Sequence, residues 1–172
     1  MHYRQLGKTG YRVSEIGLGC WQLGGDFGPL ADNTASDILR TAADCGINFW
    51  DTADVYGGGE SERRIGAFPQ KPENLLVATK VGRGQGLYPD GYSLPAMRDS
   101  LRGSAHRLGV DTIDLAQLHC VPPEILKQGD IFHWMELLQN EGLIRHYGAS
   151  VETIEEAFTC LEQPGLATLQ II

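Results

Sequence analysis

The sequence predicts an α/β fold built around a parallel β-sheet, and two regularities support this prediction. Short apolar runs alternate along the chain with longer stretches in which apolar residues recur at helical spacing. One run and the stretch that follows it together occupy about 30 residues, which is the length of a βα repeat. Strands that alternate with helices of this length favour βαβ units, whose strands run parallel.

Six apolar runs are predicted to be strands because each is short and is followed by turn residues or by an amphipathic stretch. The runs are residues 16–19, 47–50, 75–78, 113–118, 144–149 and 167–172. A different element precedes them. The segment 3–13 turns at residues 7–10, which read GKTG, and this pattern predicts an N-terminal β-hairpin.

Helices are predicted between the runs, where apolar residues lie three and four positions apart. The apolar stripes are Ile38, Leu39, Ala42 and Ala43; then Leu94, Met97, Leu101, Ala105 and Leu108; then Ile154, Ala157, Phe158 and Leu161. We expect each stripe to face the sheet.

The helix boundaries carry recognisable capping residues. Thr34 with Asp37 predicts a variant of the capping box at the start of the first helix, and Gly46 is predicted to end that helix. Ser93 is predicted to cap the helix that carries the second stripe, and Gly109 follows its last residue. These signals divide the chain into the same units as the apolar pattern does.

Length and charge limit the classes of function. The 172 residues fit one domain, and no linker-like composition divides them. The chain has 14 basic and 22 acidic residues, a formal net charge of −8. This balance argues against a nucleic acid or an anionic membrane as the main partner, because both favour a basic surface. No apolar run approaches the roughly 18 residues of a membrane span.

The cysteines indicate the compartment. Cys20, Cys45, Cys120 and Cys160 lie far apart and form no CxxC pair, which matches neither a zinc finger nor a disulfide framework. We interpret them as free thiols in a reducing environment. The N-terminus lacks the apolar core of a signal peptide, so we expect a cytoplasmic protein. His119 and Cys120 are adjacent but have no partners at ligand spacing, so we expect no metal.

Two glycine-rich segments resemble nucleotide-binding motifs without completing them. Residues 7–9 read GKT, but the glycine that a P-loop places five residues before its lysine is absent. Residues 82–86 read GRGQG after a predicted strand, yet Leu87 occupies the third glycine position of the dinucleotide fingerprint. We therefore predict a loop over residues 82–91, and long loops in compact domains are often functional.

Polar residues that can do chemistry end three successive predicted strands. Asp51 follows the second run, Lys80 follows the third run and Thr79, and His119 follows the fourth run. The carboxyl ends of parallel strands meet at one rim, which is where such folds bind ligands. Each residue alone also fits an ordinary structural role, but a carboxylate, an ammonium and an imidazole on consecutive strands favour a functional site.

Tyr56 lies five residues beyond Asp51, and a short loop would bring its phenol over the same rim. An ammonium beside a phenol favours loss of the phenolic proton, so Lys80 would make Tyr56 a proton donor near neutral pH. Asp51 would pair with Lys80 and keep it charged. His119 would hydrogen-bond a substrate oxygen. The four residues together predict a site for general acid catalysis.

These residues resemble the aldo-keto reductase family. The similar segments are residues 6–10 (LGKTG), residues 13–19 (VSEIGLG), residues 48–53 (NFWDTA), and Tyr56, Gly57, Ser61 and Glu62. The set Asp51, Tyr56, Lys80 and His119 matches the family's catalytic tetrad strand for strand. The resemblance covers the whole chain and implies a (β/α)₈ TIM barrel of aldo-keto reductase type with an N-terminal β-hairpin.

The resemblance also implies an activity, namely NADPH-dependent reduction of an aldehyde or ketone to an alcohol by hydride transfer. Tyr56 would be the general acid, and NADH is the alternative cofactor. The positions that match cofactor-binding residues are Gly19, Cys20, Trp21, Asp51, Ser150 and Gln170. Val151 stands where the family often has asparagine, which removes one expected hydrogen bond to the cofactor. The implied partner is a small-molecule carbonyl compound.

A complete barrel of this kind needs about 250 residues. We therefore expect residues 1–172 to form a single aldo-keto reductase domain that is incomplete at its C-terminus and truncated to about six strands. The missing strands would supply an aromatic residue that stacks on nicotinamide and basic residues that bind the 2′-phosphate. By itself the chain is expected to bind NADPH weakly, to lack measurable turnover and to self-associate through its open sheet.

A second interpretation stays open at this stage. The chain fits a noncatalytic or regulatory aldo-keto-reductase-like protein, either of the ion-channel-subunit type or an inactive fragment. The complete tetrad argues against a pseudoenzyme, but it is compatible with a regulatory protein. The substrate and the oligomeric state have no signature in the sequence.

Overall fold

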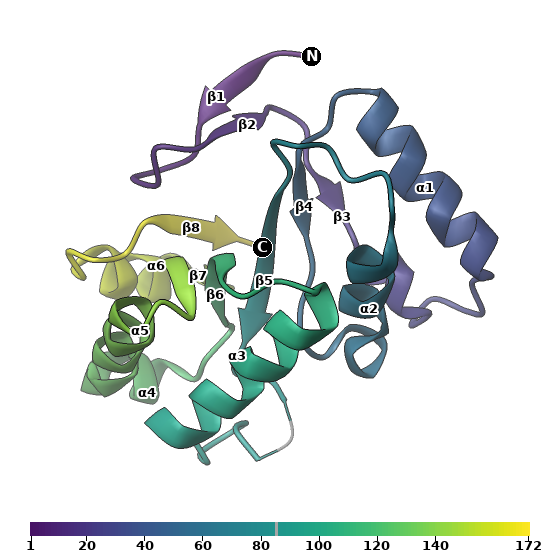
Figure 1. Ribbon diagram of the computed structural model, residues 1–172. Coiled ribbons are helices and arrows are strands. Elements are labelled where there is room, and N and C mark those ends of the chain that lie inside the picture. Colours follow the sequence, from purple (N-terminus) through teal and green to yellow (C-terminus); the bar gives the residue numbers. More distant parts are fainter. Residues whose placement is uncertain (85) are drawn as a thin grey trace.

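A six-stranded parallel sheet forms the centre of the computed structural model, which describes residues 1–84 and 86–172 (Figure 1). The strands are β3 (Leu18–Gly19), β4 (Phe49–Asp51), β5 (Leu76–Val81), β6 (Ile113–His119), β7 (Ile144–Val151) and β8 (Thr168–Ile171). Each strand pairs with the next along the chain, in the order β3-β4-β5-β6-β7-β8. This order is that of a curled part of a (β/α)₈ barrel, and all six predicted strands are confirmed with small shifts at their ends.

The predicted N-terminal hairpin is also confirmed. Its strands β1 (Tyr3–Gln5) and β2 (Arg12–Ser14) pair antiparallel. The Ser14 amide donates to Asn48 Oδ1 at 2.7 Å, and the Lys8 amide donates to the Ala167 carbonyl at 2.9 Å. Asn48 and Ala167 lie just before β4 and β8, so the hairpin sits at the amino ends of the strands. The opposite rim of the sheet remains for a site.

Helices follow the strands and cover the outer face of the curled sheet (Figure 1). They are α1 (Asp32–Asp44), α2 (Glu60–Ala67), α3 (Leu94–Leu108), α4 (Pro123–Gln128), α5 (Asp130–Asn140) and α6 (Ile154–Leu161), with short 3₁₀ turns η1 (Trp21–Gly24) and η2 (Tyr56–Gly59). The core forms two apolar clusters. One packs β6 and β7 against α3 and α5, and the other packs α1 and α2 around Trp50.

The helix boundaries agree with the sequence prediction except at α1. Ser93 caps α3 by accepting a hydrogen bond from the Ala96 amide, and Gly109 ends the helix in the left-handed conformation. The predicted capping box of Thr34 with Asp37 is wrong, because α1 begins at Asp32 and its N-cap is Ala31, three residues before Thr34. Thr34 therefore lies inside the first turn, where its hydroxyl has no helix end to cap.

Helix α6 differs from the prediction in the face that it buries. Ala157 is buried, as expected, but Ile154, Phe158 and Leu161 are exposed by 68%, 63% and 58%. The helix turns its small side chains toward the sheet, and Cys160 shares this buried side. Three of the four residues in the predicted stripe of α6 thus lie on its outer face.

The length and hydropathy of the helices also bear on whether one of them could span a membrane. Among the described residues, none of them is long and apolar enough to cross a bilayer.

Candidate active site

Three adjacent strands bring Asp51, Lys80 and His119 to one rim of the sheet. Asp51 is the last residue of β4, His119 is the last residue of β6, and Lys80 lies one residue before the end of β5, between them. The strands are parallel and in register, so their carboxyl ends lie side by side. Tyr56 comes from η2 in the loop after β4 and joins the same group.

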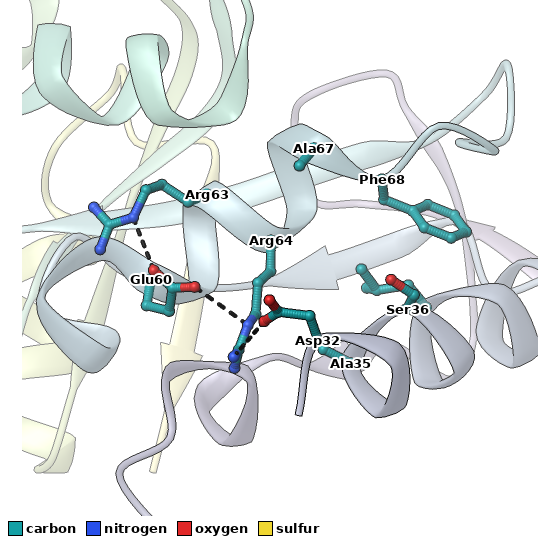
Figure 2. A pocket seen from close by; sticks show the side chains of 9 residues that line it. Asp32, Ala35, Ser36, Glu60, Arg63, Arg64, Ala67 and Phe68 are labelled. Atoms are coloured by element: carbon teal, nitrogen blue, oxygen red, sulfur yellow. Dashed lines mark hydrogen bonds and ion pairs between the residues drawn. The ribbon is translucent and has the colours of Figure 1, made fainter. Parts of the chain in front are cut away.

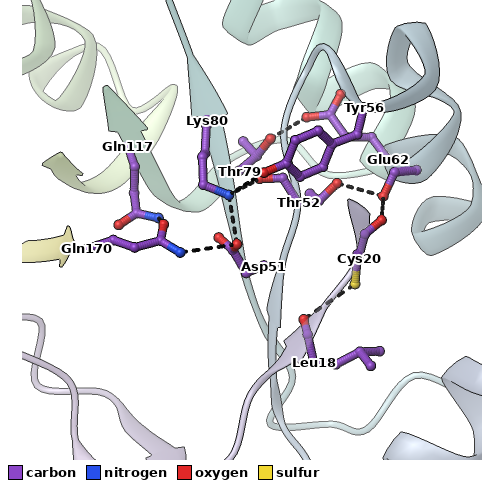
Figure 3. A network of polar contacts seen from close by, with 11 residues as sticks. Leu18, Cys20, Asp51, Thr52, Tyr56, Glu62, Thr79, Lys80, Gln117 and Gln170 are labelled. Atoms are coloured by element: carbon purple, nitrogen blue, oxygen red, sulfur yellow. Dashed lines mark hydrogen bonds and ion pairs between the residues drawn. The ribbon is translucent and has the colours of Figure 1, made fainter. Parts of the chain in front are cut away.

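The Lys80 ammonium is the centre of this group (Figure 3). It donates to Asp51 Oδ2 at 2.7 Å, to the Thr52 carbonyl at 3.0 Å and to the Tyr56 hydroxyl at 3.2 Å. The Lys80 side chain is only 2% exposed. An ammonium has three protons to donate, and these three acceptors match them. The contacts therefore fix the direction of the ammonium beside the phenol.

His119 faces the Tyr56 ring edge-on, with the ring centroids 5.9 Å apart. Burial is the main cause that lowers the pKa of His119 to about 3, and the positive charges of Lys80 and Arg83 lower it further. The imidazole is consequently neutral at physiological pH. A neutral imidazole donates one hydrogen bond from one nitrogen, so it can orient a carbonyl oxygen without adding a positive charge.

A cavity of about 550 Å³ opens over this rim. Its lining residues are Trp21, Asp26, Val55, Tyr56, Arg83, His119, Cys120, Glu152 and Ile172. Trp21 stacks on the Tyr56 ring at a centroid distance of 5.5 Å, and Arg83 Nη2 lies 3.8 Å from Glu152 Oε1. The lining thus includes an aromatic wall at Trp21 and charged side chains from the neighbouring loops, together with the phenol and the imidazole.

Some lining residues were absent from the sequence prediction. Asp26, Arg83 and Glu152 lie in loops after β3, β5 and β7, and no spacing pattern singles them out. The sequence prediction rests on residues at the carboxyl ends of strands, whereas these three residues lie in loops, whose course the sequence pattern does not predict. The predicted loop over residues 82–91 does contribute Arg83, and its residue Gln85 lies outside the described residues.

The positions predicted to bind a cofactor divide into two groups. Trp21 lines the cavity, Gly19 ends β3 opposite Asp51, and Ser150 pairs with His119 across β6 and β7. Cys20, in contrast, is fully buried, and its thiol donates to the Leu18 carbonyl at 3.5 Å within the core. The structure does not bring the Cys20 side chain to the cavity.

Gln170 lies between the side chains of Asp51 and Gln117 and contacts both of them. Its side-chain amide donates to Asp51 Oδ2 at 3.4 Å, and its carbonyl oxygen accepts from Gln117 at 3.0 Å (Figure 3). The buried Ser150 hydroxyl, on the adjacent strand, has no hydrogen-bond partner among the described residues. An unpaired buried hydroxyl next to an amide is a polar position that suits the carboxamide of a nicotinamide ring.

Buried polar contacts hold the loop that carries Tyr56. The Ser61 hydroxyl lies 2.8 Å from the Thr52 hydroxyl and donates to the Cys20 carbonyl at 2.7 Å. Glu62 is fully buried, accepts from the Thr79 hydroxyl and pairs with Arg107 of α3 at 2.6 Å (Figure 3 shows Glu62 and Thr79). Ser61 therefore ties the loop to the residues that follow β3 and β4, and Glu62 ties it to β5 and α3.

Asp54 makes a further contact from this loop to α3. Its carboxylate accepts from the Ser100 hydroxyl of α3 at 2.9 Å, while Oδ1 has no partner among the described residues. Burial is the main cause that raises the pKa of Asp54 to about 6, and Glu62 raises it further. Asp54 lines a separate cavity of about 380 Å³, together with Asp99 and Arg107.

A further cavity, of about 260 Å³, lies between α1 and α2 and away from the tetrad (Figure 2). Its charged side chains pair with one another. Arg63 and Arg64 both contact Glu60, and Arg64 also contacts Asp32 at 2.9 Å. These charges are therefore already neutralised by one another. Within the described range, no cluster of His, Cys, Asp and Glu side chains of metal-binding size occurs.

Comparison with known proteins agrees with the geometry. Residues 15–172 match the profile of the Aldo/keto reductase family. The chain is 36% identical over 153 residues to L-galactose dehydrogenase of Arabidopsis thaliana, which covers 84% of the chain and 47% of that protein. It is 37% identical over 158 residues to the uncharacterized oxidoreductase YqkF of Bacillus subtilis, which covers 87% of the chain and 49% of that protein.

Solved structures give the same result. The aldo-keto reductase AKR11C1 from Bacillus halodurans, in its holo form, superimposes with a TM-score of 0.84 at 31% sequence identity. The match covers 99% of this chain and 57% of that one. The chain thus spans about half the length of the curated relatives that it matches.

Proposed function

The chain belongs to the aldo/keto reductase family, and from this premise we propose that its rim carries out the proton transfer of an NADPH-dependent carbonyl reductase. The observation that supports the proposal most strongly is the contact of 3.2 Å between Lys80 Nζ and the hydroxyl of Tyr56, which lines the 550 Å³ cavity. The substrate is an aldehyde or ketone small enough for that cavity, and the product is the alcohol.

Tyr56 is the general acid in this proposal. As the carbonyl oxygen gains negative charge, the Tyr56 hydroxyl donates its proton to that oxygen. The Lys80 ammonium, held by Asp51 and the Thr52 carbonyl, stabilises the charge left on the phenolic oxygen. His119 is neutral and donates a hydrogen bond to the same carbonyl oxygen, which orients the substrate.

The nicotinamide cofactor supplies, when bound, the hydride that the carbonyl carbon receives. Ser150 and Gln170 are proposed to hold its carboxamide, because one hydroxyl is unpaired and the other side chain lies beside it on β8. The two hydrogen bonds of Gln170 to Asp51 and Gln117 would be exchanged for that contact. Gly19 and Trp21 are proposed to border the same ring from the loop after β3. We propose NADPH as the cofactor.

The domain and its location complete the proposal. Residues 1–172 are proposed to be one aldo-keto reductase domain that lacks part of the barrel and, with it, the contacts to the cofactor phosphates. The four cysteines are free thiols in the structure, as a reducing compartment would keep them, and we propose a cytoplasmic location.

A chimera tests the function. Residues 1–172 would replace the superimposed part of the Bacillus halodurans reductase, which returns the remaining strands to the sheet. We expect this chimera to oxidise NADPH when an aromatic aldehyde is added, and the matched Lys80→Met chimera to lose most of that rate. A folded chimera that binds NADPH and reduces no carbonyl compound would contradict the proposal.

A further inference from the structure

The segment after Tyr56 needs external support to hold one conformation. Gly57, Gly58 and Gly59 follow the phenol directly, and all three have positive φ angles of 57°, 61° and 91°. Glycine loses more conformational freedom on folding than any other residue, so three in succession are costly to order. Ser61 and Glu62 fix the far end of this segment, and a second anchor is needed at its beginning.

Asp26 provides that anchor from the loop after β3. Its Oδ2 atom accepts two hydrogen bonds at 3.0 Å, one from the Gly57 amide and one from the Trp21 indole nitrogen. Both bonds go to a carboxylate, and hydrogen bonds to an ionised acceptor are stronger than neutral ones. One carboxylate oxygen thus joins the residue next to Tyr56 to the aromatic side chain that covers Tyr56.

Trp21 depends on this contact for its orientation. Its ring is nearly parallel to that of Tyr56, with an interplanar angle of 16°, and Phe27 packs against it edge-on at 4.8 Å. Trp21 is nevertheless 49% exposed and Phe27 is 67% exposed. Burial alone does not hold an indole that is half exposed, so the hydrogen bond to Asp26 selects the stacked position.

The loop that carries Asp26 is itself firmly placed. A Cβ atom at Gly24 would lie 2.6 Å from the Gly57 nitrogen, so the two backbones touch. Arg64 of α2 donates to the Leu23 carbonyl at 2.7 Å and to the Leu30 carbonyl at 2.8 Å, which pins both ends of the loop (Figure 2 shows Arg64). The Asp26 carboxylate is therefore presented from a fixed support.

We propose that Asp26 is a positioning residue, which holds the Trp21 wall and the Tyr56 hydroxyl in one arrangement at the mouth of the cavity. Its importance for carbonyl reduction rests on the proposed function. Its structural effect does not, because the two hydrogen bonds exist without substrate or cofactor. Asp26→Ala removes both bonds. Asp26→Asn keeps an oxygen that can accept both, and it is the matched control.

Nuclear magnetic resonance of the 172-residue chain tests the proposal. The chain has three tryptophans, so its nitrogen–proton spectrum contains three indole signals, and Trp21→Phe identifies the one from Trp21. We expect Asp26→Ala to accelerate solvent exchange of the Trp21 indole proton and of the Gly57 amide proton by at least about tenfold. We expect Asp26→Asn to restore most of the protection of both protons.

Two outcomes would overturn the proposal. In the first, the Trp21 indole proton and the Gly57 amide proton of Asp26→Ala exchange with solvent at the wild-type rate, which would show that neither hydrogen bond constrains its donor. The second needs no variant: the wild-type protein would show no nuclear Overhauser contact between the Trp21 and Tyr56 rings and no protection of the indole proton. This second measurement decides the question even if Asp26→Ala does not fold. No turnover is measured, so a failure here is distinct from a failure of the proposed function.

Discussion

The Lys80 ammonium lies 3.2 Å from the Tyr56 hydroxyl, and its other two contacts hold it in that position. Asp51 and the Thr52 carbonyl accept its remaining protons, so the ammonium has no alternative direction in which to donate. The phenol therefore meets a charge whose place is set before any substrate arrives. Preorganised charge of this kind is the main way in which enzymes stabilise charge that develops in a transition state.

Replacement of the proposed acid tests its role against that of the aromatic ring. In the chimera, Tyr56→Phe keeps the stacking with Trp21 and removes the hydroxyl. Loss of general acid catalysis typically lowers the rate by about 10²–10⁴. We expect kcat to fall within this range while the dissociation constant of NADPH, measured by fluorescence titration, stays unchanged. A larger change in NADPH affinity than in kcat would assign Tyr56 to cofactor binding.

The ion pair of Lys80 with Asp51 is expected to be essential for stability. Lys80 is 2% exposed, so Asp51→Asn leaves a buried ammonium without its carboxylate. Such a change typically costs about 3 kcal/mol or more of the free energy of unfolding. Asp37→Asn, in the exposed pair with Arg40, is the control and should cost at most about 1 kcal/mol. Urea unfolding of both variants measures the two costs, and equal costs would contradict the expectation.

The buried imidazole predicts sensitivity to acid. The folded-state pKa of His119 is about 3, below its usual value of 6.5. As the pH falls below about 6.5, the unfolded state binds a proton that the folded state does not, so stability decreases down to about pH 3. His119→Gln should remove this loss, which is roughly 1.4 kcal/mol per pH unit. His106→Gln, at an exposed position, should leave the pH dependence unchanged.

Asp54 predicts a pH effect of the opposite sign. Its folded-state pKa is about 6, above the usual 3.8, so ionisation of the folded protein is unfavourable. The cost is fully present above about pH 6 and disappears as the pH falls toward 3.8. Asp54→Asn should therefore raise the free energy of unfolding above that of wild type. We expect this gain to be on the order of 2–3 kcal/mol larger at pH 7 than at pH 4. Asp99→Asn, which is exposed on the same cavity, should show no such difference.

The strand-end residues could be predicted because parallel strands leave little freedom. Once six apolar runs are assigned to one parallel sheet, the residues that end each strand must lie at the same rim, and this places Asp51, Lys80 and His119. The position of Tyr56 needed only a short loop. The turn at residues 7–10 predicted the hairpin, and the resemblance to the family added the barrel in which the strands are arranged.

Other features depend on contacts that periodicity does not encode. Cys20 follows a strand like the predicted site residues, but its side chain turns into the core, because a strand end has two faces. Asp26 reaches the cavity from a loop, and nothing in its sequence neighbourhood marks it. The stripe on α6 has helical spacing, yet Ala157 and not Phe158 faces the sheet, since spacing alone does not say which side is inward.

Transfer of deuterium in the chimera tests the central claim most directly. The chimera would receive NADPH with deuterium at both C4 positions and an aromatic aldehyde, and the alcohol would be analysed by mass spectrometry. We predict one deuterium on the carbinol carbon, formed at a rate that Tyr56→Phe lowers by about 10²–10⁴. A chimera that binds NADPH but yields an alcohol without deuterium, or whose Tyr56→Phe variant keeps the full rate, would contradict the account.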